Sequence, residues 1–333
     1  MRKFPTLCFI SSVGTGWDET AGTDKVEAAN VTEASQDQGR RGAIAAPRTS
    51  VPYAANRGVR IYWQEWGSGP PVLLIMGLSF NLDMWFRVVP WLVQSHRVIA
   101  FDNRGVGRSD APRGPYTIRI MAEDAMSVLR DAQVNEAVHV LGASMGGMIA
   151  QELVLSYPEA FRSLVLACTA CGPLYRLAWP NWRRSPSLKE WVLLRGEVRE
   201  RSLVRLLYAD TTAQQQIDED IRMRLLRPPT LKGVLSQFAA ILVWSSYHRL
   251  PQVRIPTLVV HGEDDHVLPV ANGRIIARRI PGAEFMLIKQ AGHMLGTDQP
   301  EICMRELTRF LQRVESYESP VHAGGTQTEA LTA

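Results

Sequence analysis

The sequence of 333 residues has little of three things: cysteine, long apolar runs and an excess of charge of one sign. Four cysteines are too few for a disulfide framework in a chain of this length. No apolar run reaches the roughly 20 residues that cross a bilayer, so we expect no membrane span. A net charge of +4 is too small to indicate nucleic-acid binding, and we expect no nucleic-acid partner.

Two of the cysteines, Cys168 and Cys171, form a CxxC pattern. Such a pair binds zinc together with a second pair of ligands at matching spacing, which this sequence lacks. A redox-active pair opens a helix, whereas this one closes an apolar run. We therefore interpret both as small buried or loop residues, and we predict no metal and no cofactor.

Both ends of the sequence are polar and low in aromatic residues. Residues 1–50 and 317–333 are predicted to be disordered extensions. The opening residues, MRKFPTLCFISSVG, are basic and then mixed, without the long apolar core of a signal peptide. We therefore expect a cytoplasmic protein.

Between the ends, short apolar runs alternate with longer amphipathic stretches. Nearly continuous apolar runs are typical of strands buried on both faces, and alternation with helices predicts an α/β fold with a mostly parallel sheet. Predicted helices are Ile118–Asp131 and Met145–Tyr157, the latter stopped by Pro158. The predicted strands are Arg60–Trp66, Val72–Met76, Arg97–Phe101, Ala137–Leu141, Ser163–Cys168, Thr257–His261 and Glu284–Ile288.

The alternation breaks over residues 172–251, which are rich in aromatic side chains and in arginine. We interpret this stretch as an inserted helical cap, or lid, over a site. The core is then made of residues 51–171 and 252–316. The lid's arginine excess has two interpretations, attraction of an acidic substrate or a solvated helical surface.

A serine stands between glycines in VLGASMGGMIAQ, where a predicted strand passes into a predicted helix. Gly142-Ala143-Ser144-Met145-Gly146 fits G-x-S-x-G in the strand–turn–helix context of a nucleophile elbow. The tight turn projects the hydroxyl, and the glycines remove side chains that would clash. The alternative is a glycine-rich turn that only lets strand and helix pack closely.

An acid and a histidine follow Ser144 in the chain order of a Ser–acid–His triad. The acid lies in GEDDHVLP, where Asp264 and Asp265 are both candidates, and the histidine lies in AGHMLGTDQPE. His293 is the predicted base, because a histidine accepts a serine proton near neutral pH and a carboxylate fixes its tautomer. His266 is the nearest competitor.

With these motifs, the chain from about Val51 to Ser316 resembles the α/β-hydrolase superfamily, in particular its esterase and enol-lactonase-like branch with a helical cap. The pattern G-x-x-D of that family selects Asp265. The resemblance also implies backbone N–H donors for an oxyanion at Leu78 and Met145. The family usually has His-Gly before the first donor, where this chain has Met76-Gly77.

Other residues of the same loops receive supporting roles. Phe80 and Trp85, with Trp179 of the cap, are predicted to line the substrate pocket. Arg104 and Asp110, in FDNRGVGRSD, are predicted to brace loops.

The resemblance implies a serine hydrolase that cleaves a small carboxylic ester, lactone or thioester through an acyl-enzyme on Ser144. The substrate is predicted to be a small acyl compound, aromatic or acidic in character. Three alternatives stay open: a carbon–carbon bond hydrolase or an acyltransferase with the same triad, and a non-catalytic binding protein on the same fold. The sequence carries no signal for the oligomeric state.

Overall fold

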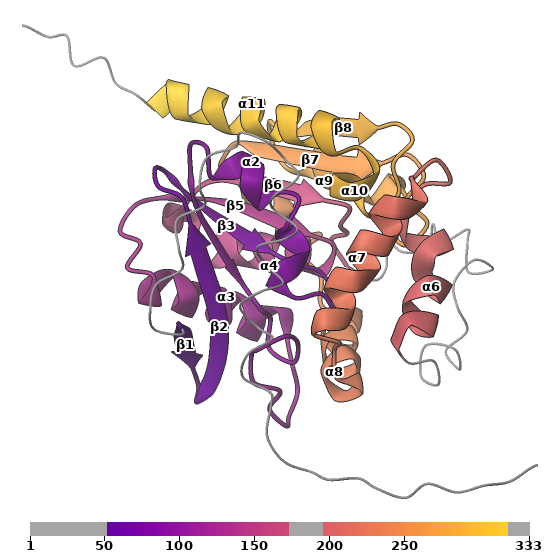
Figure 1. The fold of residues 1–333 in the computed structure, drawn as a ribbon. Coiled ribbons are helices and arrows are strands. Elements are labelled where there is room, and N and C mark those ends of the chain that lie inside the picture. Colours follow the sequence, from indigo (N-terminus) through magenta and orange to yellow (C-terminus); the bar gives the residue numbers. More distant parts are fainter. Residues whose placement is uncertain (1–51, 173–195, 319–333) are drawn as a thin grey trace, which may run out of the picture. The chain divides into compact units, whose positions relative to one another are not determined.

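The computed structural model describes residues 52–172 and 196–318. Within these residues the strands form one eight-stranded sheet, which extends across Figure 1. The strands are β1 (Tyr53–Asn56), β2 (Val59–Trp66), β3 (Pro71–Ile75), β4 (Arg97–Phe101), β5 (Val138–Ala143), β6 (Phe161–Ala167), β7 (Thr257–Gly262) and β8 (Glu284–Ile288). Their order is β1-β2-β4-β3-β5-β6-β7-β8.

Only the first strands depart from a parallel arrangement. β1 pairs antiparallel with β2, and β2 pairs antiparallel with β4, whereas every pair from β4 to β8 is parallel. The predicted α/β class and its mostly parallel sheet are therefore confirmed. The strand β1 was not predicted, because YAAN contains no apolar run and only Ala54 is fully buried.

The helices complete the architecture. The longer ones are α3 (Ile118–Asp131), α4 (Met145–Ser156), α6 (Gly196–Leu207), α7 (Gln214–Leu226), α8 (Leu231–Val243), α9 (Ala271–Arg279) and α11 (Pro300–Glu318). Short turns are η1 (Leu82–Trp85), α2 (Val89–Leu92), η2 (Pro158–Ala160), η4 (Leu250–Gln252) and α10 (Leu295–Asp298). No helix among the described residues combines the length and apolar character needed to span a membrane.

The two faces of the sheet are covered by different helices. Side chains such as Leu73 and Ile75 pack with α3, α4 and α9, whereas their neighbours Val72 and Leu74 pack with α2 and α11. The alternation follows from the period of two along a strand. Because both faces are buried, β3 reads as the continuous apolar run PVLLI.

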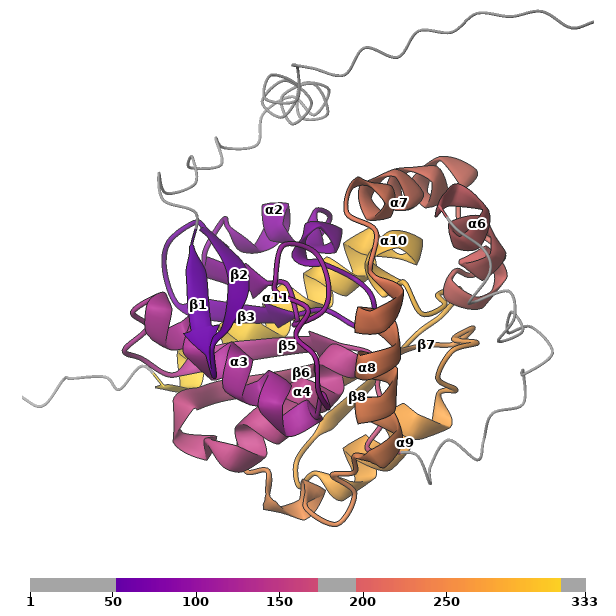
Figure 2. The ribbon, with the colours of Figure 1, turned by 90° about the horizontal axis from the view of Figure 1, so that it is seen from below.

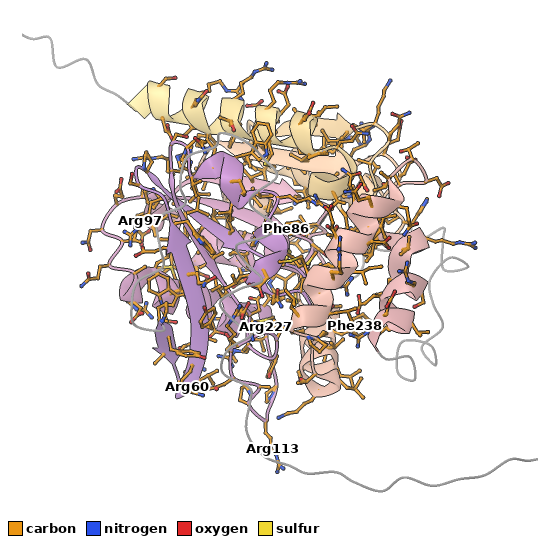
Figure 3. All side chains as sticks on the ribbon, viewed as in Figure 1. Arg60, Phe86, Arg97, Arg113, Arg227 and Phe238 are labelled. Atoms are coloured by element: carbon orange, nitrogen blue, oxygen red, sulfur yellow. The ribbon has the colours of Figure 1, made fainter. Side chains whose placement is uncertain are left out.

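The helices α6, α7 and α8 lie between β6 and β7 in the chain, and in Figure 1 they lie together on the right, with β1 and β2 on the left. The same three helices lie beside one another in Figure 2. They occupy part of the predicted cap, whose boundaries at residues 172 and 251 stay a prediction. In Figure 3, Phe238 on α8 lies on this side, far from Arg97 at the start of β4.

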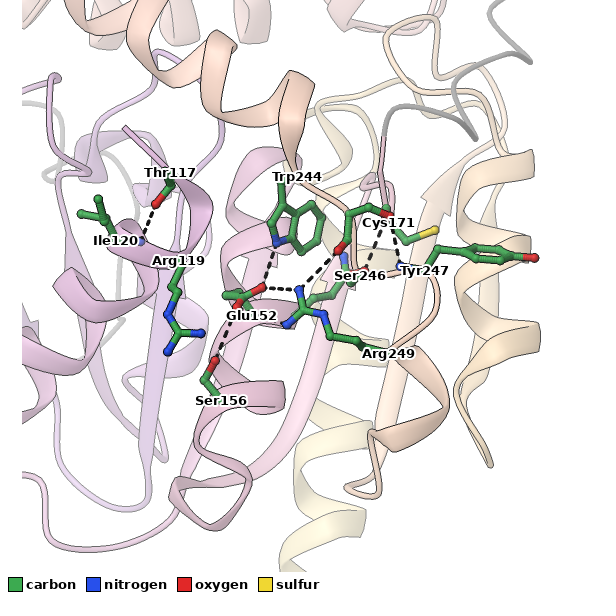
Figure 4. Close-up of polar contacts among 12 residues, drawn as sticks. Thr117, Arg119, Ile120, Glu152, Ser156, Cys171, Trp244, Ser246, Tyr247 and Arg249 are labelled. Carbon is green, nitrogen blue, oxygen red and sulfur yellow. Dashed lines mark hydrogen bonds and ion pairs between the residues drawn. The ribbon is translucent and has the colours of Figure 1, made fainter. Parts of the chain in front are cut away.

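The segment that follows α8 is joined to α4 by a network of hydrogen bonds (Figure 4). Glu152 of α4 accepts hydrogen bonds from Trp244 Nε1 at 2.8 Å and from Arg249 Nη2 at 2.6 Å. Ser246 Oγ donates to Gln151 Oε1 at 2.7 Å. Burial works to raise the pKa of Glu152, but Arg249 and Trp244 outweigh it and lower that pKa. The network fixes the end of the inserted helices on the helix that begins beside Ser144.

Candidate active site

Ser144 occupies a strained corner between β5 and α4. Its backbone has φ 55° and ψ −119°, a left-handed φ that a non-glycine residue rarely adopts. A Cβ on Gly142 would lie 2.3 Å from the carbonyl oxygen of Gly146, and one on Gly146 would lie 2.0 Å from that of Ile75. Both glycines are therefore required by close backbone contacts, as the spacing predicted.

Hydrogen bonds from β6 hold this corner in place. The N–H of Ser144 donates to the carbonyl of Ala167 at 2.9 Å, and Thr169 Oγ1 donates to the carbonyl of Ser144 at 2.6 Å. A Cβ on Gly147 would lie 2.6 Å from the Thr169 side chain. Thr169 thus stabilises the strained backbone, a role that the sequence analysis did not assign.

His293 and Asp265 form a pair across two loops. His293 Nδ1 lies 2.9 Å from Asp265 Oδ2, while Asp265 Oδ1 accepts the N–H groups of Val267 and Leu268, each at 2.9 Å. Burial works to raise the pKa of Asp265, but His293 and His261 outweigh it and hold that pKa well below its usual range. The carboxylate stays ionised and can fix His293 in the tautomer with a proton on Nδ1.

Ser144 and His293 line the same pocket. In the described part of the chain no hydrogen bond joins Ser144 Oγ to His293, and such contacts commonly tighten only when a substrate is bound. Asp264 is half-buried, and its N–H donates to the carbonyl of Ala291. The structure therefore brings His293 to Asp265 on one side and to the pocket on the other.

The loop of His293 is held by the end of α6. The N–H groups of His293 and Met294 both donate to the carbonyl of Leu207, at 2.8 and 3.0 Å. Asp298 accepts the N–H of Gly292 at 2.6 Å and the hydroxyl of Thr212 at 2.6 Å. Burial raises the pKa of Asp298 to about 6. The bonds that Leu207 and Thr212 make to this loop were not found from the sequence, because no local pattern links residues so far apart.

The loop after β3 lies directly against Ser144. A Cβ on Gly77 would lie 3.0 Å from Ser144 Cβ, so a larger residue would crowd the serine. Among the residues that the structure describes, no acceptor is found for the backbone N–H of Leu78 or of Met145. Two unused donors near a serine hydroxyl are what an oxyanion hole requires.

Gln237 of α8 ties this loop to its neighbour. Its Oε1 accepts the N–H of Ser79 at 3.0 Å, and its Nε2 donates to the carbonyl of Arg104 at 2.9 Å. Gln237 is fully buried, and Ser79 has a φ of 67°. Asn103 Nδ2 also donates to the carbonyl of Met76, at 2.9 Å. The backbone on either side of Leu78 is thus fixed by side-chain amides.

The pocket is lined mainly by apolar side chains, among them Phe80 and Trp85, whereas Trp179 lies outside the described residues. About 870 Å³ of space lies within it, open solvent at its mouth included. Its walls come from the loop after β3, η1, β5, β6, β7, α10 and α11. Apolar lining residues include Met76, Met84, Val88, Leu141, Val165, Val260, Leu295, Met304 and Leu307.

Arg87 of the pocket lining and Arg199 of the predicted cap are each paired with carboxylates. Arg87, a lining residue, contacts Asp220 and Glu219 at 3.1 and 2.7 Å. Arg199 of the predicted cap pairs with Glu200 at 3.1 Å and is largely buried, so it is not part of a solvated surface. The other arginines cited for the cap, at 176, 183, 184 and 195, lie outside the described residues.

Two further predictions are confirmed. Arg104 braces a loop through a double contact with Asp124 at 2.6 and 2.7 Å, and Asp110 pairs with Arg60 at 3.0 Å. Cys168 and Cys171 are both buried free thiols. Burial raises the pKa of both thiols, that of Cys171 to about 11, which disfavours the reactive thiolate.

A family model described as alpha/beta hydrolase fold matches residues 70–300. The chain belongs to this α/β-hydrolase fold family. It is therefore a hydrolase, and the resemblance seen in the sequence is confirmed.

Three proteins illustrate the relationship. A poly(3-hydroxyalkanoate) depolymerase of Ectopseudomonas oleovorans is 32% identical over 248 residues, which cover 73% of this chain and 84% of the relative. A 3-oxoadipate enol-lactonase of Acinetobacter baylyi is 26% identical over 253 residues, which cover 73% of this chain and 89% of the relative. The structure of a thermophilic esterase from Thermogutta terrifontis superposes with a TM-score of 0.68 at 26% identity, covering 81% and 99%.

Proposed function

We propose that this hydrolase cleaves a carboxylic ester, lactone or thioester through an acyl-enzyme on Ser144. The observation that carries the proposal is one pocket that holds both Ser144, at its strained corner, and His293, whose other nitrogen contacts Asp265 at 2.9 Å. A serine hydroxyl is a weak nucleophile until a base removes its proton. The arrangement supplies that base and the acid that orients it.

In the first half of the reaction Ser144 Oγ attacks the carbonyl carbon, and its proton passes to His293 Nε2. The carbonyl oxygen becomes an oxyanion, which the N–H groups of Leu78 and Met145 stabilise. Asp265 stabilises the imidazolium through Nδ1–H. As the bond to the leaving group breaks, His293 returns the proton to that group, and the acyl chain stays on Ser144.

In the second half a water molecule replaces the leaving group. His293 takes a proton from the water, whose oxygen attacks the acyl carbon. The same donors stabilise the second oxyanion. When the bond to Ser144 breaks, His293 returns the proton to Ser144 Oγ, and the carboxylic acid leaves.

The substrate is inferred from the pocket lining. Since the walls are almost entirely apolar and Arg87 is paired with a carboxylate, we propose an apolar or aromatic acyl group that lies against Phe80 and Trp85. Trp179 stays a predicted wall residue. The names of the relatives, a depolymerase of a poly(3-hydroxyalkanoate) and an enol-lactonase, support an ester or lactone bond.

Turnover of p-nitrophenyl esters from acetate to long acyl chains tests the proposal. We expect activity that disappears in Ser144→Ala and persists in Ser316→Ala, an exposed serine on α11. The chain-length profile then measures the pocket. A folded protein inactive on every ester, lactone and thioester would contradict the proposal. It would favour a carbon–carbon bond hydrolase, a transfer reaction to another acceptor, or a binding protein.

A cytoplasmic location is also proposed, from the sequence alone. Fractionation of the native cells, with intact-mass measurement of the recovered chain, tests it. A chain that begins well after Met1 and is found outside the cytoplasm would contradict the proposal.

A further inference from the structure

Three side chains of types that bind metals converge at the end of the sheet remote from Ser144. His96 immediately precedes β4, His139 is the second residue of β5, and Glu315 lies on α11. We call these three residues the His–His–Glu cluster. Since Ser144 follows the other end of β5, about 16 Å of strand separates the cluster from the pocket.

The potential ligand atoms face one another. His96 Nε2 lies 2.9 Å from Glu315 Oε1, and His139 Nε2 lies 3.2 Å from the same oxygen. All three ligand atoms lie within 4.8 Å of one another. Both histidines are fully buried, and the Glu315 side chain is 27% exposed.

The far nitrogen of each ring is already engaged. His139 Nδ1 lies 2.7 Å from Ser163 Oγ, and His96 Nδ1 lies 2.8 Å from Ser95 Oγ. His96 Nε2 forms a hydrogen bond with Glu315 Oε1 at 2.9 Å, and a bound cation would take the place of the proton in that bond. When Nδ1–H of His139 donates to Ser163, its Nε2 presents a lone pair toward the same oxygen. Such outer contacts are the usual way in which a metal-binding histidine is oriented.

The Nε2 atom of His139 is a buried polar atom that a cation could bind. It is buried and has no hydrogen-bond partner among the described residues, although the Glu315 carboxylate lies 3.2 Å away. An uncompensated contact between a nitrogen lone pair and a carboxylate oxygen is unfavourable in the interior of a protein. A positive ion between the two atoms removes that cost.

We propose that the His–His–Glu cluster binds a divalent cation of the zinc type through His96 Nε2, His139 Nε2 and the Glu315 carboxylate. Two imidazoles and one carboxylate are a known ligand set for Zn²⁺, with bonds of about 2.0–2.2 Å, which places tetrahedral ligand atoms about 3.3 Å apart. The exposed side of Glu315 leaves room for water as the fourth ligand. The positive charge of Arg162 acts on His139 and opposes the ion, so binding should be weaker than in a four-ligand structural site.

Such an ion would link α11 to the starts of β4 and β5. It would stabilise the fold because it binds the folded chain and not the unfolded chain. It would leave the chemistry at Ser144 unchanged. The site is independent of the proposed function, because none of its three residues lines the pocket.

The test uses full-length protein stripped with a chelator and titrated with Zn²⁺ by calorimetry, with thermal unfolding followed in parallel. We expect one Zn²⁺ to bind and Tm to rise with Zn²⁺ concentration. His139→Asn preserves a polar group for Ser163 but removes Nε2, and Glu315→Gln removes the charge. Each should weaken this binding at least tenfold and abolish the Tm shift, whereas His248→Asn, an exposed histidine, should behave like the wild type.

Binding by a second group must be counted apart. Cys168, Asp265 and His293 also lie close enough together to bind one ion. Zn²⁺ binding that remains in both His139→Asn and Glu315→Gln, and that inhibits ester turnover, is therefore assigned to the pocket. The proposal is overturned if the wild type binds no Zn²⁺, or if His139→Asn and Glu315→Gln bind it with unchanged affinity. Should His139→Asn fail to fold, Glu315→Gln decides alone, since its side chain lies partly at the surface.

Discussion

Asp265 Oδ2 lies 2.9 Å from His293 Nδ1, although the two residues are 28 positions apart in the chain. The carboxylate is buried, and its other oxygen is held by two backbone N–H groups. It therefore cannot turn away from the imidazole. This rigid contact is the basis for assigning the base and its orienting acid.

Replacing Asp265 by asparagine should lower kcat by about 10³–10⁴-fold, because the amide no longer favours the tautomer with a proton on Nδ1. The measurement is steady-state hydrolysis of the best p-nitrophenyl ester. Asp264→Asn is the matched control, since this neighbour is half-buried, and its activity should stay close to that of the wild type. A larger loss of kcat in Asp264→Asn than in Asp265→Asn would show that Asp265 is not the acid of the triad.

Gln237→Met should lower kcat roughly 10- to 100-fold with little change in KM, because a loosened Ser79 displaces the nearby N–H of Leu78. Gln237→Glu keeps an acceptor for Ser79 and should recover part of the activity. Gln252→Met changes an exposed glutamine of η4 and serves as control. Equal kcat in Gln237→Met and Gln252→Met would show that α8 does not position this loop.

Gly146→Ala should destabilise the fold by ~2–4 kcal/mol, since its Cβ would lie 2.0 Å from the carbonyl oxygen of Ile75. Gly296→Ala is the control, because its Cβ would meet only Val88, at 3.7 Å. Urea unfolding measures both. A Gly146→Ala protein as stable as Gly296→Ala would mean that the corner is looser than described.

Asp298 should make stability depend on pH. Burial raises its pKa to about 6, above the ordinary 3.8, so the folded chain binds this proton more tightly than the unfolded chain. Its stabilising effect is full below pH 3.8 and is lost as pH rises through about 6.

Asp298→Asn removes this effect. Relative to the wild type, its free energy of unfolding should therefore improve by about 1 kcal/mol between pH 5 and pH 8. Asp210→Asn, at an exposed position, should show no such trend. A difference between Asp298→Asn and wild type that does not change with pH would contradict the assignment.

The parallel part of the sheet could be predicted because strands buried on both faces leave continuous apolar runs. The prediction placed β4 and β8 at their observed bounds and the others within one or two residues. The strand β1 was not predicted, because Tyr53–Asn56 lies at the edge of the sheet and is paired on one side only. Helix α3 was predicted at its observed bounds, and in the structure its N-cap Thr117 accepts the N–H of Ile120.

The elbow at Ser144 could be predicted because its geometry is local, imposed by glycines two residues away. The supports from Thr169, Gln237 and Asp298 could not be, because each joins segments distant in the chain and uses one ordinary polar side chain. The hydrogen bond from Ser79 to Gln237, for example, spans 158 positions. Only the folded chain reveals such partners.

The most direct test of the central claim is to trap the acyl-enzyme. Wild-type protein is mixed with an excess of a p-nitrophenyl ester, quenched in acid within the first turnovers and analysed by peptide mass mapping. Our account predicts the acyl mass on the peptide that contains Ser144, and none in Ser144→Ala. Ester turnover without any adduct, or with the adduct on another residue such as the pocket thiol Cys168, would contradict it.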